Sequence, residues 1–294
     1  MDNIQLFSHS PLGQASVMES RWTIYRSRTS AMIGLIGLLI IMVLSITGSF
    51  MDNPEQAEQL LAPAWHPTGT TAHLLGTDLV GRDIFIRLLQ GAKLTLGTSL
   101  LSVSVALIIG CGLGLMAAYF RGYVQLIVMR TMDVIFAIPS LVLAIIVVAI
   151  LGPGLVNAGI AVGIVLLPNF VRTTTRHVIE EMQKPYVDAA RLDGAIPIRI
   201  LFKSVFPNIS APLILQTTIA LSTAIIEIAL LGFLGLGAQA PSPEWGMMLA
   251  EARTSMHIAP WAVTAPGLAI MITVLLINFI GDGLRDALDP KQMK

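Results

Sequence analysis

The sequence predicts an all-α membrane protein with six transmembrane helices, and three observations lead to this fold class. Of the 294 residues, 54% are apolar and only 12% are charged, whereas an ordinary soluble domain carries about 25% charged residues. The 18 basic and 18 acidic residues leave no formal net charge, and the mean hydropathy is +0.77. A soluble chain this apolar and neutral would aggregate. Six apolar stretches approach the roughly 20 residues that cross a bilayer core.

The six spans follow from these stretches in order. The second contains Gly110, Gly112 and Gly114, small residues that favour close helix packing in lipid. A Gly-Pro-Gly turn at 152–154 separates the third span from the fourth, so the two are expected to form a helical hairpin. The fifth contains one carboxylate, Glu227. The expected spans cover residues 31–51, 94–120, 134–151, 155–171, 211–231 and 261–280.

The positions of the basic residues predict the orientation. With the N-terminus inside, the cytoplasmic segments hold 14 of the 18 Lys and Arg residues, as the positive-inside rule requires. Both termini are therefore predicted to be cytoplasmic. Residues 1–30 form a cytoplasmic N-terminal segment, and 31–294 form one membrane domain with a long cytoplasmic loop at 172–210. The first span is longer than the roughly 7–15 apolar residues of a signal peptide, and no A-x-A-like site follows it, so it is expected to stay uncleaved.

Motifs for catalysis are missing from the sequence. It contains no G-x-x-x-x-G-K-[ST] nucleotide loop, no G-x-S-x-G elbow and no H-E-x-x-H metal motif. The single cysteine, Cys111, can form no bridge within the chain. The balanced charge argues against a nucleic-acid partner. We therefore predict a transport or scaffold component that is not an enzyme and has no catalytic residue, bound cofactor or metal.

The long cytoplasmic loop has a regular pattern of prolines and glycines. Pro185 and Gly194 bracket a predicted short helix over 186–193. Pro197 begins a second short helix, which Pro207 is expected to end. Two short helices around a glycine turn would form a compact knob. A knob of this kind suits docking into a groove on a cytoplasmic partner.

The knob sequence resembles the EAA---G---------I-LP loop of permease subunits in bacterial ATP-binding-cassette (ABC) importers. The spacing is complete, but Asp188, Ser204 and Phe206 stand where the family has Glu, Ile and Leu. In that family the loop is the coupling helix that sits in the ATPase subunit. The resemblance implies an ATPase-coupling role for Asp188, Ala189, Ala190, Arg191, Asp193, Gly194 and Pro207.

Three further segments, 75–83, 231–246 and 281–290, resemble the C-type subunit of dipeptide and oligopeptide permeases. Residues 191–195 and 258–261 are also similar to the Sap peptide permease of the same branch. The resemblance implies a type I ABC importer permease fold in the bacterial inner membrane, surrounded by lipid. It also implies a homologous B-type permease subunit, two ABC ATPases that carry ATP and Mg, and an extracytoplasmic peptide-binding protein. Peptides, including antimicrobial peptides, are the expected substrates; nickel and glutathione importers share much of the pattern and remain alternatives.

A polar face on the fifth span is the candidate substrate pathway. Gln216, Thr223 and Glu227 lie seven and four residues apart, on one side of a helix. A carboxylate within a span is costly and usually faces the bundle interior or water. Glu227 either lines the pathway and meets the amino group of a peptide, or makes an interhelical hydrogen bond or ion pair.

Other features leave alternatives open. Pro139 lies inside the third span, where either a transport hinge or a plain packing kink fits. Residues 77–87 and 239–256 either contact the binding protein or cap the outer mouth. From another class, an ion-coupled secondary transporter would need paired intramembrane acids and usually an inverted repeat. A membrane scaffold without transport is the remaining rival.

Overall fold

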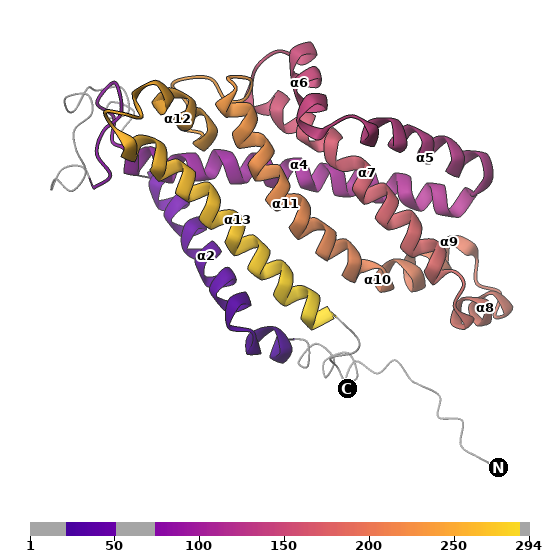
Figure 1. Cartoon of the computed structure of the whole chain (residues 1–294). Coiled ribbons are helices and arrows are strands. Elements are labelled where there is room, and N and C mark those ends of the chain that lie inside the picture. The colour runs from indigo at the N-terminus through magenta and orange to yellow at the C-terminus, as the bar shows by residue number, and fades with distance from the viewer. Residues whose placement is uncertain (1–21, 51–73, 289–294) are drawn as a thin grey trace.

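The computed structural model describes residues 22–50 and 74–288, and these form a bundle of helices (Figure 1). Within these residues the β-structure is limited to an isolated bridge between Thr77 and Asp83. Five helices are long and apolar enough to cross a membrane, or six spans if one bent pair counts as a span. The all-α membrane prediction is confirmed. The spans are α2 (Thr29–Phe50), α4 (Ile84–Phe120), the pair α5 (Gly122–Ala137) and α6 (Ser140–Leu151), α7 (Leu155–Glu181), α11 (Ser210–Phe233) and α13 (Pro260–Leu288).

The third span differs from the single helix, kinked at Pro139, that was expected over 134–151. It begins earlier, as α5, and α5 and α6 meet at an angle of 96°. The break lies at Ile138 and Pro139, which have extended ψ angles of 132°. Proline lacks an N–H donor and forces the residue before it out of the helical region, so the helix ends there. Pro139 therefore breaks this span.

Close contact between α4 and α7 forms the centre of the bundle. A Cβ atom at Gly114 would lie 2.6 Å from the Thr174 Cβ, whereas one at Gly112 would meet nothing within 4 Å. Glycine thus lets the two backbones approach where the helices cross. The buried apolar residues around this crossing include Val103, Ala106, Ala158, Ala161, Val162, Leu166, Phe170, Ala220, Ala224 and Ile228.

Helices α2 and α13 pack side by side and run antiparallel (Figure 1). Arg28 and Asp286 form an ion pair of 2.9 Å where α2 begins and α13 ends. These helix ends lie on the same side of the molecule as α8 (Pro185–Leu192). The short helix α12 (Trp245–Ala252) lies at the opposite end (Figure 1). The two candidate regions for partner binding are therefore at opposite ends of the bundle. Most of segment 1–30, the prolines of the loop 52–73 and the last residues of 281–290 lie outside the described residues.

Candidate functional site

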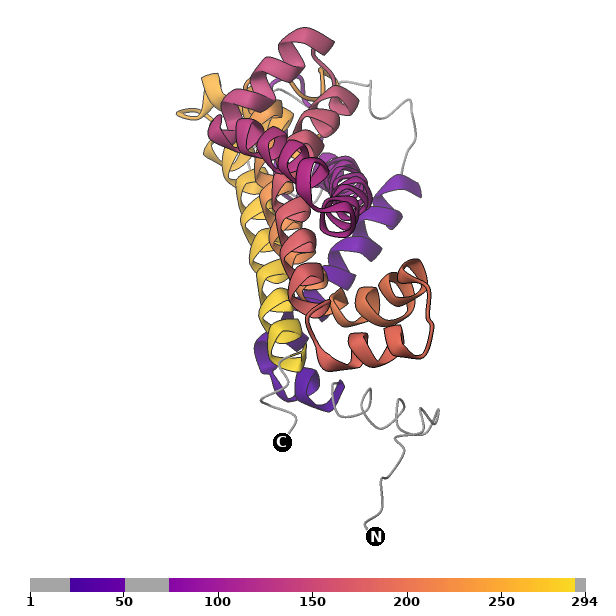
Figure 2. The same cartoon turned by 90° about the vertical axis from the view of Figure 1, so that its right-hand side faces the viewer.

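The loop between α7 and α11 folds into the expected knob, which we define as residues 185–208. It consists of α8, α9 (Pro197–Ile200), the π-helical turn η1 (Leu201–Val205) and α10 (Phe206–Asn208). Prolines occupy the first turns of α8 and α9, where no N–H donor is needed. Gly194 makes the turn between them with a φ of +79°. The knob projects sideways from the ends of α7 and α11 (Figure 2).

Pro207 does not end the second helix, which corrects the expectation from the sequence. The turn before it widens into η1, where the Phe206 N–H donates to the Leu201 carbonyl. The helical path continues beyond the proline, since the Ile209 N–H donates to the Val205 carbonyl at 3.1 Å. A π-turn provides the space that a proline ring needs inside a helix.

The inner face of the knob is an apolar core shared with three long helices. Val187, Leu201 and Val205 from the knob are buried. They cluster with Val178 of α7 and Leu213 of α11. Burial of this kind stabilises each side chain by about 1.5–3 kcal/mol. The knob is therefore fixed to the spans on either side of it.

The outer face of the knob presents large apolar side chains to solvent. Leu192 is 89% exposed, Ile196 is 64% exposed and Phe202 is 57% exposed. Asp188 and Arg191, both exposed, pair with each other at 2.9 Å. Large exposed apolar side chains on a folded element are typical of a protein interaction surface. Exposed residues of the predicted coupling set are Asp188, Ala189, Arg191, Asp193, Gly194 and Pro207, and Ala190 is half-buried.

A polar cluster at the base of the knob was not anticipated from the sequence. The Tyr186 hydroxyl donates to Glu181 Oε1 at 2.8 Å. The Asn208 side-chain amide donates to the Tyr186 oxygen at 3.2 Å. Lys184 pairs with Glu181 Oε2 at 2.6 Å. Burial raises the pKa of Tyr186. Asn208 is 22 residues from Tyr186, and no local spacing pattern could have predicted that they meet.

The three residues of the predicted polar face of α11 differ in burial. Gln216 and Thr223 are half-buried, and the Thr223 hydroxyl donates to the Ile219 carbonyl at 3.0 Å. Glu227 is only 5% exposed and lies near the side chain of Ser140, the first residue of α6. Its Oε2 atom is buried without a hydrogen-bond partner among the described residues. Glu227 therefore contacts the broken span in this conformation.

Both halves of the broken span pack against α7. Arg172 of α7 forms an ion pair of 2.7 Å with Asp133 of α5. The Arg172 guanidinium also lies 4.2 Å from the centre of the Phe136 ring. These contacts hold α5 on α7, and α6 packs against both α7 and α11.

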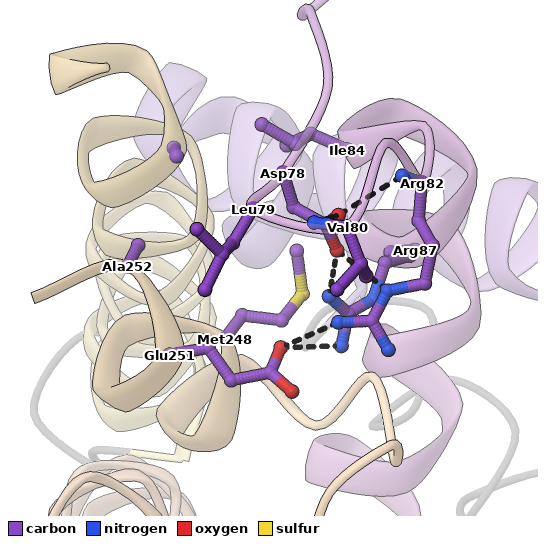
Figure 3. A pocket seen from close by; sticks show the side chains of 10 residues that line it. Asp78, Leu79, Val80, Arg82, Ile84, Arg87, Met248, Glu251 and Ala252 are labelled. Carbon is purple, nitrogen blue, oxygen red and sulfur yellow. Dashed lines mark hydrogen bonds and ion pairs between the residues drawn. The ribbon is translucent and has the colours of Figure 1, made fainter. Parts of the chain in front are cut away.

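The opposite end of the bundle carries a second structured region, the α12 cap, which we define as residues 75–87 and 239–256. The Asp78 carboxylate accepts backbone hydrogen bonds from Val80 and Arg82 at 3.0 and 2.9 Å. It also pairs with the Arg82 and Arg87 guanidinium groups. Glu251 of α12 pairs with the same two arginines at 3.1 and 2.8 Å. These side chains line a cavity of about 150 Å³ and point toward one another (Figure 3).

Glu244 completes the α12 cap from inside. It is fully buried, accepts from the Met247 N–H at 2.9 Å as the N-cap of α12, and accepts from the Thr95 hydroxyl at 2.9 Å. Burial raises the pKa of Glu244, although these hydrogen bonds act in the opposite direction. The neighbouring Trp245 ring donates to the Leu88 carbonyl at 2.9 Å. The two outer segments are therefore joined in one unit by contacts within the chain.

Comparison with known proteins identifies the family. Residues 89–294 match the family described as binding-protein-dependent transport system inner membrane component. The chain belongs to this family. It is 46% identical to the di/tripeptide transport system permease protein DppC of Pseudomonas aeruginosa, across 94% of this chain and 93% of the relative. It is also 46% identical to the peptide transport system permease protein SapC of Escherichia coli O6:H1, over 92% and 93% of the two chains.

The fold is shared with a distant transporter of known structure. A chain of the methionine ABC transporter MetNI, solved in inward-facing conformations, matches with a TM-score of 0.57 and 21% identity. The match covers 69% of this chain and 96% of the MetNI chain. The type I ABC importer permease fold predicted from the sequence is thereby confirmed. The family match includes the whole knob and α11, whereas the Asp78 turn precedes it.

Proposed function

We propose that this chain is the C-type permease subunit of an ABC importer that moves short peptides into the bacterial cytoplasm. The observation that carries the proposal is the identity of 43–46% with permeases named for dipeptides, di/tripeptides and peptides. These relatives match over more than nine-tenths of this chain. Its place is the inner membrane, with both termini and the knob in the cytoplasm, as the basic residues favour.

The chain works with three further subunits and a binding protein that delivers the substrate. A homologous B-type permease completes the channel, two ABC ATPases dock below it, and an extracytoplasmic peptide-binding protein docks above. ATP and Mg bind to the ATPases, and this chain binds no cofactor or metal and performs no catalysis. The exposed apolar face of the knob, with the predicted coupling residues around Ala189 and Gly194, is the docking surface for an ATPase.

Transport follows from movement of the knob. ATP-driven closure of the ATPases shifts the knob, and α7 and α11 tilt because they share its apolar core. Such a tilt alternates access between two states whose populations nucleotide controls. Gln216, Thr223 and Glu227 belong to the substrate pathway. In this conformation Glu227 is covered by α6, so a peptide amino group reaches it only after α6 moves away from α11.

Purification of the complex from cells that express the whole operon tests the assembly. We expect a tagged chain to co-purify in mild detergent with a second permease and two ABC ATPases, identified by mass spectrometry. Recovery of this chain alone would contradict the proposal and favour an ion-coupled transporter or a scaffold. The reconstituted complex, supplied with its binding protein, should then import labelled Ala-Ala with ATP. Import of nickel or glutathione in its place would reassign the substrate while keeping the importer mechanism.

A further inference from the structure

We infer that Tyr186 is a positioning residue that holds the knob in fixed register with both of the spans that flank it. The inference rests on the proposed function, because it assigns a coupling role within the same importer. Tyr186 is the second residue of α8. Its hydroxyl joins Glu181, the last residue of α7, to Asn208, the last residue of α10 before α11.

The geometry makes this a connection between three elements. Glu181 is only 7% exposed, and Lys184 holds its other carboxylate oxygen at 2.6 Å. Asn208 is also held, because its amide donates to the Ser204 carbonyl at 2.9 Å. Glu181 and Asn208 are therefore each held by a second contact that does not involve the Tyr186 hydroxyl. A tyrosine oxygen suits this place because it donates and accepts at once.

The apolar core beneath the knob cannot supply the same restraint. Contacts among Val178, Val187 and Leu213 are non-directional, so they hold the knob on the bundle but resist sliding weakly. Hydrogen bonds, in contrast, are directional and weaken steeply when the donor–hydrogen–acceptor angle falls below about 120°. When an ATPase pushes the knob, the Tyr186 hydroxyl makes α7 and α11 move together. Without it, part of the displacement is lost as sliding between the knob and the spans.

The variant Tyr186→Phe removes one oxygen atom and keeps the ring. We expect the complete complex, reconstituted in liposomes with its binding protein, to assemble normally and to hydrolyse ATP at its basal rate. The number of labelled Ala-Ala molecules imported per ATP should fall about tenfold, as expected for loss of a hydrogen bond to a carboxylate. Tyr123→Phe is the matched control, because Tyr123 is 85% exposed on α5 and far from the knob in sequence; it should transport like the wild type.

Partner variants make the test specific. Asn208→Ala should lower the transport ratio in the wild type but add little in the Tyr186→Phe background, because both changes break the same connection. Normal coupling in Tyr186→Phe, or failure of its complex to assemble, would overturn the inference; the latter would make Tyr186 a purely structural residue. Absence of Ala-Ala import by the wild-type complex would instead contradict the proposed function.

Discussion

The α12 cap and the knob are built from similar parts, short helices joined by glycine and proline turns, yet they expose different side chains. In the α12 cap, Asp78 and Arg87 are buried and paired, and the Trp245 ring is packed inside. In the knob, charged residues pair at the surface, and Leu192 and Phe202 project into solvent. The α12 cap satisfies its polar groups within the chain. The knob leaves an apolar surface that another protein can cover.

The contrast also separates two kinds of sequence motif. The L-G-T-D-x-x-G-R-D segment at 75–83 supplies the turn and the charges that close one end of the bundle. The motif around Ala189 and Gly194 makes few contacts with the rest of its own chain and stays exposed. A motif can therefore reflect internal structure in one place and an external partner in another, and burial distinguishes the two.

The largest loss of stability is expected for a substitution in the α12 cap. Arg87→Ala leaves Asp78 with one arginine and removes one of the two partners of Glu251. Removing one member of a buried charge cluster costs about 3 kcal/mol or more. We expect a clear drop in the thermal unfolding temperature of the purified subunit in detergent. Arg253→Ala, an exposed arginine of the same region, is the control; equal losses for the two variants would mean that the cluster contributes little.

A smaller effect is expected at Glu244, where charge and hydrogen bonding can be separated. Glu244→Ala removes the N-cap of α12 and should cost about 2 kcal/mol. Glu244→Gln keeps an acceptor oxygen and a similar shape but cannot ionise, so its loss of stability should stay below about 1 kcal/mol. The thermal unfolding temperatures of the two purified variants in detergent measure these losses.

The pH dependence of stability tests whether burial of the Glu244 carboxyl group raises its pKa. Because burial raises the pKa of Glu244 in the folded state, that state still holds a proton at pH values where the unfolded chain, with a Glu pKa of about 4.3, has released it. The protonated Glu244 therefore contributes to the stability of the folded state at low pH, and this contribution is lost as the pH rises through the folded pKa. The stability of the wild type relative to Glu244→Gln should therefore fall as the pH rises above the unfolded pKa of about 4.3. The opposite trend would show that the hydrogen bonds outweigh burial.

The smallest effect on stability is expected in the knob. Leu192→Ser changes a side chain that is 89% exposed, so the unfolding free energy of the subunit should change by less than about 0.5 kcal/mol. The same change should reduce co-purification of the ATPases, since it removes apolar area from the proposed docking surface. Val187→Ser, on the buried side of α8, should instead destabilise the subunit. Normal ATPase recovery with Leu192→Ser would place the docking surface elsewhere.

Much of the fold could be predicted because the bilayer limits the options. Long apolar stretches must be helices, and the prolines and glycines of the knob set its helix starts and its turn. The proline predicted a bend at Pro139 but not its angle of 96°, because the angle depends on what α5 and α6 pack against. The continuation of the helix beyond Pro207 was missed, because a π-turn has no clear pattern in a single sequence.

The sequence by itself determined the membrane class, the number of apolar segments and the position of the knob, because hydropathy, proline and glycine act locally. Only the tertiary structure decided which polar groups meet. Glu227 contacts Ser140, Tyr186 joins Glu181 to Asn208, and Glu251 reaches Arg87. These pairs are brought together by helix packing between segments distant in the chain, and the period of a single helix carries no information about its neighbour.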